Sequence, residues 1–173
     1  MKVYKFIKSK IERDYFFVTG NLKVDSKYFI KKIEEGIHQN NNMNFETNVK
    51  GSMTSYNFFE KDKKFYHDII LPIFDMLDEQ NFEDKYYLKS GWGFKHNFGD
   101  YTKKHTHIPN FLSAAIMLTA HSQFLSFPEI NENVESKLGN FVIFSSFLSH
   151  GNKRNNLEKP RYGLSLNISY DTD

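Results

Sequence analysis

The chain has 173 residues, of which 39% are hydrophobic and 25% are charged, and its formal net charge at pH 7 is +2. This length and composition are typical of one globular domain, so we expect a single domain over residues 1–173. Because the chain has no cysteine, disulfide scaffolds, zinc–thiolate sites and iron–sulfur clusters are excluded, and any metal must be held by His, Asp or Glu.

Two helices are predicted in the first half of the chain. Residues 25–37 open with capping residues and place their apolar side chains on one helical stripe, and Gly36 is expected to weaken or end this helix. A second stripe predicts a helix over about residues 62–77, in which Pro72 is a candidate kink. The polar residues 39–42 predict a loop between the two helices.

From Tyr86 the period of the apolar residues changes to the two-residue period of β-strands. Helices followed by evenly spaced strands predict an α+β fold, with a jelly roll or barrel over residues 86–173 and supporting helices and strand in residues 1–85. The polar, loop-like segment 48–56 is a candidate cover for the mouth of a site. The predicted strands include the apolar runs 92–98, 111–118, 124–127, 141–147 and 162–170.

His105 and His107 are the first candidate metal ligands. In a strand, positions i and i+2 project from the same face, so the two imidazoles would lie side by side. Imidazole is a suitable ligand for iron, zinc and copper. The alternative is a pair of surface histidines in a loop that contains Lys103 and Lys104.

His150 is the third candidate ligand. It follows the apolar run 141–147, at the point where a strand would leave the core and its side chain would reach the mouth of a barrel. The alternative is a structural histidine held by hydrogen bonds.

Residues 161–170 alternate between polar and apolar side chains, which indicates a strand with one face in the core. One interpretation is a sheet with a solvated face, which is common in antiparallel structure. The other is that the polar face lines the interior of a barrel. Arg161 would then be a two-pronged donor to a carboxylate, Ser165 would add a hydroxyl group, and Gly163 would leave room for the ligand.

These residues together form an ordered pattern, in which His150 stands 45 residues after His105 and Arg161 stands 11 residues after His150. The pattern resembles that of the 2-oxoglutarate/Fe(II)-dependent oxygenase superfamily, in its prolyl-hydroxylase-like branch. It is closest to a subgroup of viral and bacterial oxygenases that carry a His-x-His-Pro motif. The similarity covers roughly residues 91–170, about half of the chain.

The resemblance implies a double-stranded β-helix that binds Fe(II) through His105, His107 and His150. It implies 2-oxoglutarate as cosubstrate, with its far carboxylate held by Arg161 and Ser165. With molecular oxygen, such an enzyme would hydroxylate an unidentified substrate, which we expect to be a protein side chain or a small metabolite. The further residues expected near the cosubstrate or in the pocket wall are Asn97, Ser113 and Asn167.

Position 107 departs from the pattern of the superfamily. Most members have a carboxylate there, which completes a site of two histidines and one carboxylate. A histidine at this position raises the net charge of the site by one unit. The alternative is that Asp100 or Glu129 supplies the carboxylate, with His107 supporting the site without touching the metal.

Two other functions fit the same residues. One is a cupin-type dioxygenase with three histidines that uses no 2-oxoglutarate, in which case Arg161 would not bind a cosubstrate. The other is a non-catalytic binding or structural β-domain, whose histidines are polar surface residues.

The charge pattern and the hydropathy bear on partners and location. The basic residues are scattered, and a net charge of +2 is too small to indicate nucleic-acid binding, although it does not exclude it. No apolar run approaches the roughly 20 residues needed to span a bilayer, and residues 1–5 lack the apolar stretch of a signal peptide. We therefore expect no membrane partner and, by default, a cytoplasmic location.

Overall fold

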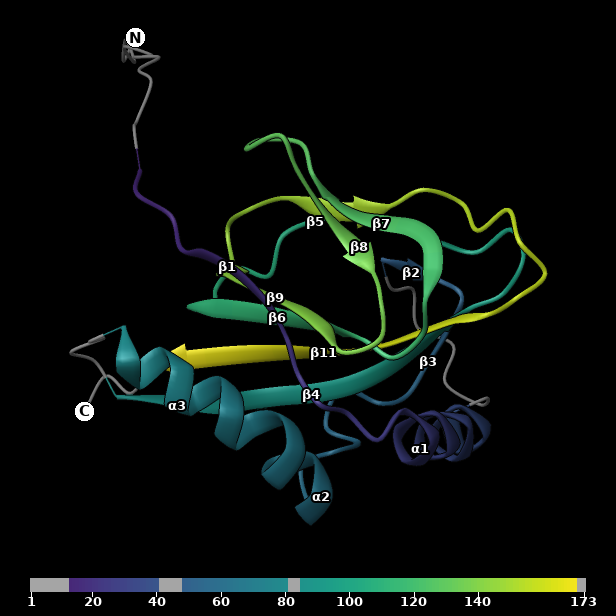
Figure 1. Ribbon diagram of the computed structural model, residues 1–173, viewed down its shortest axis with the longest axis horizontal. Coiled ribbons are helices and arrows are strands. Elements are labelled where there is room, and N and C mark those ends of the chain that lie inside the picture. Colours follow the sequence, from purple (N-terminus) through teal and green to yellow (C-terminus); the bar gives the residue numbers. More distant parts are fainter. Residues whose placement is uncertain (1–12, 41–47, 81–84, 171–173) are drawn as a thin grey trace, which may run out of the picture.

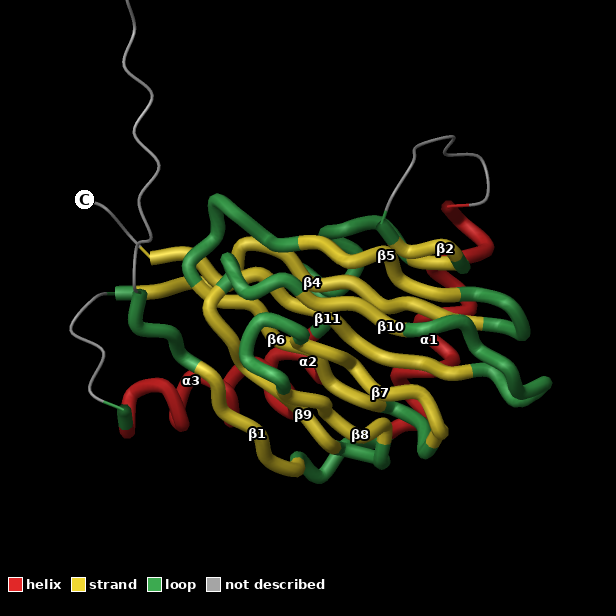
Figure 2. Tube along the Cα trace, turned by 90° about the horizontal axis from the view of Figure 1, so that it is seen from above, coloured by secondary structure: helices red, strands yellow, loops and turns green. Residues whose placement is uncertain are grey.

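The computed structural model describes residues 13–40, 48–80 and 85–170, which form two antiparallel sheets with helices on one side (Figure 1). Seen from above, the smaller sheet lies over the larger one and the helices lie behind them (Figure 2). In spatial order, the larger sheet consists of β1 (Phe17–Asn21), β9 (Asn140–Ser145), β6 (Leu112–Met117), β11 (Arg161–Tyr170), β4 (Tyr86–His96) and β3 (Ser52–Met53). The smaller sheet consists of β2 (Val49–Lys50), β5 (Tyr101–His105), β10 (His150–Asn152), β7 (His121–Phe127) and β8 (Glu132–Ser136).

The central strands of the larger sheet are buried on both faces, because successive side chains point alternately toward the helices and toward the smaller sheet. In β6, Leu112, Ala114 and Ile116 pack in the core shared with the helices, whereas Ala115 and Met117 pack between the sheets. Strand β9 follows the same alternation. The space between the two sheets is therefore enclosed by side chains of both.

The helices cover the outer face of the larger sheet (Figure 1). They are α1 (Ser26–Asn40) and the consecutive segments α2 (Lys63–Phe65), η1 (Tyr66–Ile70) and α3 (Leu71–Glu79). Helix α1 lies directly against β4 at Gly93, where a Cβ atom would come within 2.2 Å of Ile33 Cγ1. The apolar side chains that the helices bury against the sheet are Phe29, Ile33, Phe65, Ile69, Ile73 and Leu77.

Gly36 does not end the first helix, because α1 continues past it. Gly36 is buried, and a Cβ there would come within 2.6 Å of Thr54 Cγ2 and 2.7 Å of the Phe58 ring. The close packing of α1 against the segment after β3 therefore requires a residue without a side chain at position 36. The packing of the helix outweighs the low helix propensity of glycine. Residues 39 and 40 of the loop predicted at 39–42 belong to α1 instead, and residues 41 and 42 lie outside the described residues.

The second predicted helix is confirmed over Lys63–Glu79. The Asp62 carboxylate caps it by accepting a hydrogen bond from the backbone N–H of Phe65 at 2.9 Å. The irregularity expected at Pro72 takes the form of the π-helical turn η1, which ends just before it. Proline lacks an N–H and crowds the carbonyl group four residues earlier, and a wider π-helical turn accommodates both effects.

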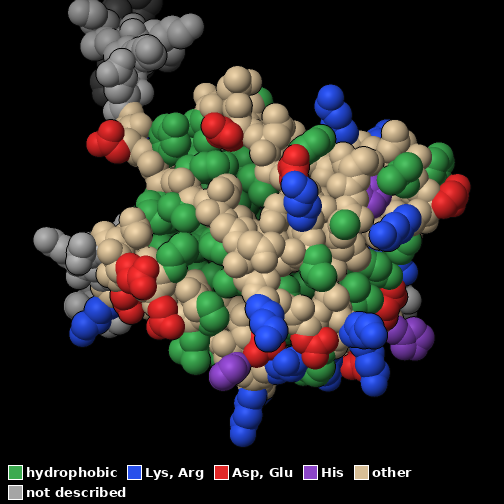
Figure 3. All heavy atoms as spheres, in the orientation of Figure 1, with side chains coloured by type: hydrophobic (Ala, Val, Ile, Leu, Met, Phe, Trp, Pro, Cys, Tyr) green, Lys and Arg blue, Asp and Glu red, His purple; other side chains and the backbone are tan. Residues whose placement is uncertain are grey.

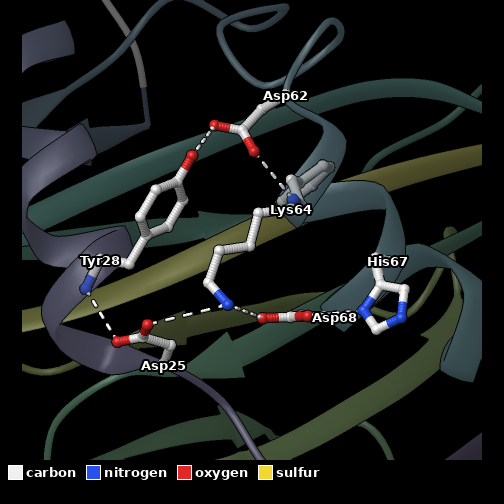
Figure 4. Close-up of polar contacts among 7 residues, drawn as sticks. Asp25, Tyr28, Asp62, Lys64, His67 and Asp68 are labelled. Atoms are coloured by element: carbon white, nitrogen blue, oxygen red, sulfur yellow. Dashed lines mark hydrogen bonds and ion pairs between the residues drawn. The ribbon is translucent and has the colours of Figure 1, made fainter.

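Polar contacts join the start of α1 to the start of α2 (Figure 4). The Tyr28 hydroxyl donates to Asp62 Oδ2 at 2.7 Å, and Lys64 Nζ lies 2.6 Å from Asp68 Oδ2 and 3.7 Å from Asp25 Oδ2. The hydrogen bond to Asp62, together with burial, raises the pKa of Tyr28 to about 12, so its hydroxyl group stays protonated. These contacts hold the two helices together on the side of the larger sheet that faces away from the smaller one.

The fold is the predicted α+β jelly roll with supporting N-terminal helices, and each predicted apolar run of the second half overlaps a strand. Segment 48–56 differs from its prediction as a loop, because it contains β2 and β3, which lie at the edges of the two sheets. Among the described residues, no helix is both long enough and apolar enough to cross a membrane. On the face shown in Figure 3, basic and acidic side chains are interspersed.

Candidate metal centre

Two neighbouring strands of the smaller sheet bring the three predicted histidines together. His105 ends β5 and is the direct antiparallel partner of His150, which begins β10. His107 follows two residues after β5, and its backbone N–H donates to Ser146 O at 2.8 Å. The centroids of the three rings lie between 4.5 and 4.9 Å apart.

One nitrogen atom of each ring points toward a common position. His107 Nε2 lies 3.1 Å from His105 Nε2 and 3.2 Å from His150 Nε2. The three candidate ligand atoms all lie within 4.8 Å of one another. The rings therefore have the convergence that a single bound ion requires.

The opposite nitrogen atom of each ring is held by an oxygen atom. The Nδ1 atoms of His105 and His150 each face the backbone carbonyl oxygen two residues earlier, at 2.8 and 3.1 Å. A carbonyl oxygen only accepts hydrogen bonds, so both Nδ1 atoms carry hydrogen. His107 Nδ1 lies 2.6 Å from Asn167 Oδ1, which also accepts.

This arrangement suits a metal ion. A neutral imidazole with hydrogen on Nδ1 has a bare lone pair on Nε2. His107 Nε2 lies 3.1 and 3.2 Å from the other two Nε2 atoms. Bare lone pairs cannot form hydrogen bonds with one another, and a cation between them would remove their repulsion. Three imidazoles are a ligand set that fits iron, zinc or copper.

Burial keeps the three rings neutral. It lowers the pKa of His107 to about 4 and that of His150 to about 3, with the neighbouring histidines acting in the same direction. Burial also lowers the pKa of His105. At pH 7 the lone pairs are therefore free of protons, as metal ligation requires.

Neither alternative carboxylate joins this group in the described part of the chain. Asp100 Oδ2 accepts a hydrogen bond from the backbone N–H of Asn97 at 2.8 Å. Glu129 Oε2 accepts one from the backbone N–H of Ser149 at 3.3 Å, and its Oε1 lies 3.8 Å from Lys104 Nζ. The ligand set that the structure offers is three imidazoles.

An inner cavity of about 40 Å³ between the sheets is lined by the three histidines and also by Arg161 and Ser165 from the polar face of β11. Apolar side chains, including those of Phe94, Leu125 and Phe144, form its walls. The candidate metal ligands and the candidate anion-binding residues, Arg161 and Ser165, thus line one cavity.

Arg161 is 1% exposed and makes no ion pair with a carboxylate of the described residues. Its guanidinium donates to Ser136 Oγ at 3.3 Å, Asn152 Oδ1 at 3.4 Å and Met117 Sδ at 3.2 Å, and lies 5.1 Å from the Phe94 ring centroid. Burial lowers its pKa to about 10, so it remains charged at pH 7. A buried cation without an acidic partner costs free energy, which a bound anion would offset.

The other three predicted cosubstrate residues lie outside this inner cavity. Asn97 is exposed in the turn after β4. Ser113 is fully buried, and its hydroxyl donates to Asn167 Oδ1 at 3.0 Å. Asn167 lines an adjoining outer cavity, and its side chain contacts His107 instead of facing Arg161's cavity.

Sequence reasoning missed several polar residues at the Arg161 end of the cavity. Thr102 and Asn152 line it, and the fully buried His96 lies opposite Arg161 in the β4–β11 pairing. His96 Nε2 lies 3.1 Å from Thr102 Oγ1. The two-residue period that His96 shares with Trp92 was the available signal for its inward position.

The outer cavity, of about 220 Å³, shares His105, His107, Trp92 and Val49 with the inner one. Segment 48–56 contributes part of its lining, so the predicted cover of the mouth does lie beside the histidines. No Asp, Glu, Lys or Arg of the described residues lines this outer cavity.

The motif on which the subgroup resemblance rests differs from its pattern at one place. The chain reads His105, Thr106, His107, Ile108 and Pro109, so the proline stands one residue later than in His-x-His-Pro. The two histidines keep the expected spacing.

Solved structures share this fold at low sequence identity. A viral collagen prolyl hydroxylase from Paramecium Bursaria Chlorella virus-1, in complex with 2-oxoglutarate, aligns with a TM-score of 0.70 and 13% identity over 88% of this chain and 94% of that chain. A prolyl-4-hydroxylase from Pseudomonas putida aligns with a TM-score of 0.65 and 13% identity over 90% and 92% of the two chains. HygX from Streptomyces hygroscopicus, with nickel and 2-oxoglutarate bound, gives a TM-score of 0.56 and 10% identity over 88% and 82%.

No protein-family model matches the sequence, and no curated protein matches it significantly. At these identities the structural comparisons show the fold. The chain has the fold of 2-oxoglutarate-dependent oxygenases, as the resemblance of its histidine and arginine pattern predicts. A shared fold leaves the chemistry to be argued from the residues of the site.

Proposed function

We propose that this protein is an Fe(II)- and 2-oxoglutarate-dependent dioxygenase that hydroxylates its substrate. The observation that carries the proposal is one cavity lined by three converging imidazoles and by Arg161, a buried cation without an acidic partner among the described residues. A metal ion would bind to the three imidazoles, and the far carboxylate of 2-oxoglutarate would pair with Arg161. Structural neighbours solved with 2-oxoglutarate or with nickel give further support.

Each residue has a defined role in this proposal. When bound, Fe(II) and 2-oxoglutarate would supply the chemistry that activates oxygen, with succinate and carbon dioxide as the products of the cosubstrate. His105, His107 and His150 would hold the iron through Nε2 and leave further coordination positions open. Arg161 would bind the far carboxylate, assisted by the Ser165 hydroxyl. The apolar walls would exclude water and so strengthen these electrostatic contacts.

The outer cavity favours an uncharged substrate group beside the metal. Tyr56 packs edge-on against Trp92, with ring centroids 5.0 Å apart and planes at 77°, and both residues line this cavity. Among the described residues, no acidic or basic side chain besides the histidines lines this cavity. The cavity therefore fits an apolar or flat, uncharged part of a protein side chain or of a small metabolite.

Anaerobic titration of the metal-free protein with Fe(II), followed by 2-oxoglutarate, tests the proposal. We expect one iron per chain and a weak visible charge-transfer band that needs both components. Admission of oxygen should then convert 2-oxoglutarate to succinate. His105→Ala should bind no iron, whereas His67→Ala, which removes an exposed histidine outside the site, should behave as wild type.

Two results would replace the proposal by its rivals. If iron binds without any band from 2-oxoglutarate, and Arg161→Ala consumes oxygen as wild type does, the site is a three-histidine dioxygenase of another kind. If neither Fe(II) nor Mn(II) binds or raises the thermal unfolding midpoint, the protein has no metal-dependent activity, because an ion bound to the folded state must stabilise it.

A further inference from the structure

We infer that Asn167 is a positioning residue that sets the tautomer of His107 and thereby opens the three-histidine group to a metal ion. The inference rests on the metal site proposed above, but it concerns a residue that would touch neither metal nor cosubstrate. It assigns Asn167 a different role from the cosubstrate contact expected from the sequence.

Asn167 is held between two neighbouring strands. Its Oδ1 atom lies 2.6 Å from His107 Nδ1 and accepts from Ser113 Oγ at 3.0 Å, while its Nδ2 donates to Ser90 Oγ at 3.1 Å. Ser113 of β6 and Ser90 of β4 are also its direct cross-strand partners. A register shift in the β4 pairing follows between Asn167 and Ile168, and such irregularities redirect side chains beside functional sites.

The tautomer of His107 decides what the group can bind. His105 and His150 have hydrogen on Nδ1, because backbone carbonyl groups hold those atoms. With hydrogen on Nε2, His107 would donate to one of its neighbours, at 3.1 or 3.2 Å, and would lose its own ligand atom. With hydrogen on Nδ1, all three lone pairs point to the common position.

An amide side chain can present either a hydrogen-bond acceptor or a donor. Asn167 presents its oxygen, so His107 must donate from Nδ1 and keep the Nε2 lone pair. Partners of this kind, which hold the far nitrogen of a metal-binding histidine, fix the orientation of the ring and strengthen the metal bond. Two serine contacts keep the amide in place without occupying the cavity.

Nitrogen-15 NMR of the histidine rings, recorded on the metal-free protein, measures the tautomer directly. In wild type we expect His107 to carry hydrogen on Nδ1 and a bare Nε2. Asn167→Asp, which keeps an acceptor, should preserve this tautomer and bind Mn(II) at least as tightly as wild type. Asn167→Leu should lose the preference and bind Mn(II) about 10- to 100-fold more weakly. The control Ser169→Ala removes a hydroxyl on the same strand face that contacts Asn110, and it should change neither property.

The inference is overturned if wild-type His107 carries hydrogen on Nε2, or if Asn167→Leu matches wild type in both tautomer and Mn(II) affinity. Should Asn167→Leu fail to fold, Asn167→Asp still decides, because loss of the Nδ1 hydrogen there contradicts the role. Failure of wild type to bind Mn(II) would overturn the proposed function, whereas normal binding with an unchanged tautomer in every variant would overturn only the role of Asn167.

Discussion

Trp92 stacks against His107, with ring centroids 5.9 Å apart and ring planes inclined by 23°. Trp92 is the only tryptophan of the chain, so the indole fluorescence of the protein arises next to one of the three proposed metal ligands.

Metal binding should therefore quench the fluorescence of Trp92. We expect strong, saturable quenching by Co(II) or Ni(II), whose open d-shells deactivate a nearby excited indole, with one ion bound per chain. Zn(II), with a filled shell, should bind and compete without comparable quenching. His107→Ala should abolish the saturable component, and His67→Ala should retain it. Saturable quenching that persists in His107→Ala would place the metal elsewhere.

Arg161 should matter for the cosubstrate and little for the stability of the ligand-free fold. We expect Arg161→Met to weaken 2-oxoglutarate binding to the Mn(II)-loaded protein by about 2–5 kcal/mol, a factor of at least about 30, because the carboxylate loses its cation. The hydrogen bonds that the guanidinium donates to oxygen atoms are long, at 3.3 and 3.4 Å. The free energy of unfolding should therefore fall by no more than about 1 kcal/mol.

Calorimetry with 2-oxoglutarate and urea unfolding of the metal-free protein measure these two effects. Arg161→Lys, which keeps the charge but not the forked geometry, is the matched control and should bind with intermediate affinity. A stability loss of about 3–5 kcal/mol in Arg161→Met, without loss of 2-oxoglutarate binding, would indicate a purely structural arginine.

Acid should destabilise the metal-free protein in part through His96. Burial, reinforced by the charge of Arg161, lowers the pKa of His96 to about 3. The unfolded chain, with an ordinary histidine pKa near 6.5, therefore takes up a proton before the folded chain does. The stabilising effect of a neutral His96 is complete above pH 6.5 and is lost as the pH falls from there toward 3.

Urea unfolding in the presence of EDTA between pH 7.5 and 5 tests this effect. His96→Gln removes the proton that the unfolded chain takes up at residue 96. The slope of unfolding free energy against pH should therefore decrease by up to about 1.4 kcal/mol per pH unit. The other buried histidines will keep part of the slope. An identical slope in wild type and His96→Gln would show that His96 is protonated equally in both states.

Several features of the site were predictable because successive side chains of a strand point to opposite faces of the sheet. Arg161 and Ser165 share one face of β11, and that face lines the cavity with the histidines. This alternation does not predict how far along the cavity a side chain lies, nor where the residues of a turn after the strand point. Asn97, which the family resemblance places near the cosubstrate, lies in an exposed turn, and the buried His96 beside it was overlooked.

Other features depend on contacts between segments far apart in the chain. Gly36 has the low helix propensity of glycine, yet α1 continues through it. A glycine is needed there because Thr54 and Phe58 occupy the space of a side chain. The contact of Asn167 with His107 likewise follows from the pairing of β11 with its neighbours and from the register shift after Asn167. Neither contact has a local signal in the sequence.

The close approach of α1 to β4 predicts a strong steric effect at Gly93. A Cβ there would lie 2.2 Å from Ile33 Cγ1, so Gly93→Ala should reduce the free energy of unfolding by about 1–3 kcal/mol. Ile33→Ala alone should cost about 2–5 kcal/mol through the cavity it leaves. Because the truncated side chain makes room for the new methyl group, the double variant should lose less than the sum. Strict additivity in urea unfolding would contradict this packing.

The central claim is that three imidazoles hold one metal ion across a shared cavity from the guanidinium of Arg161. A crystal structure of the protein grown anaerobically with Mn(II) and 2-oxoglutarate measures this directly. We expect one ion bonded to Nε2 of His105, His107 and His150, and a cosubstrate whose far carboxylate pairs with Arg161. An ion bound by Asp100 or Glu129, or a cosubstrate bound away from Arg161, would contradict it.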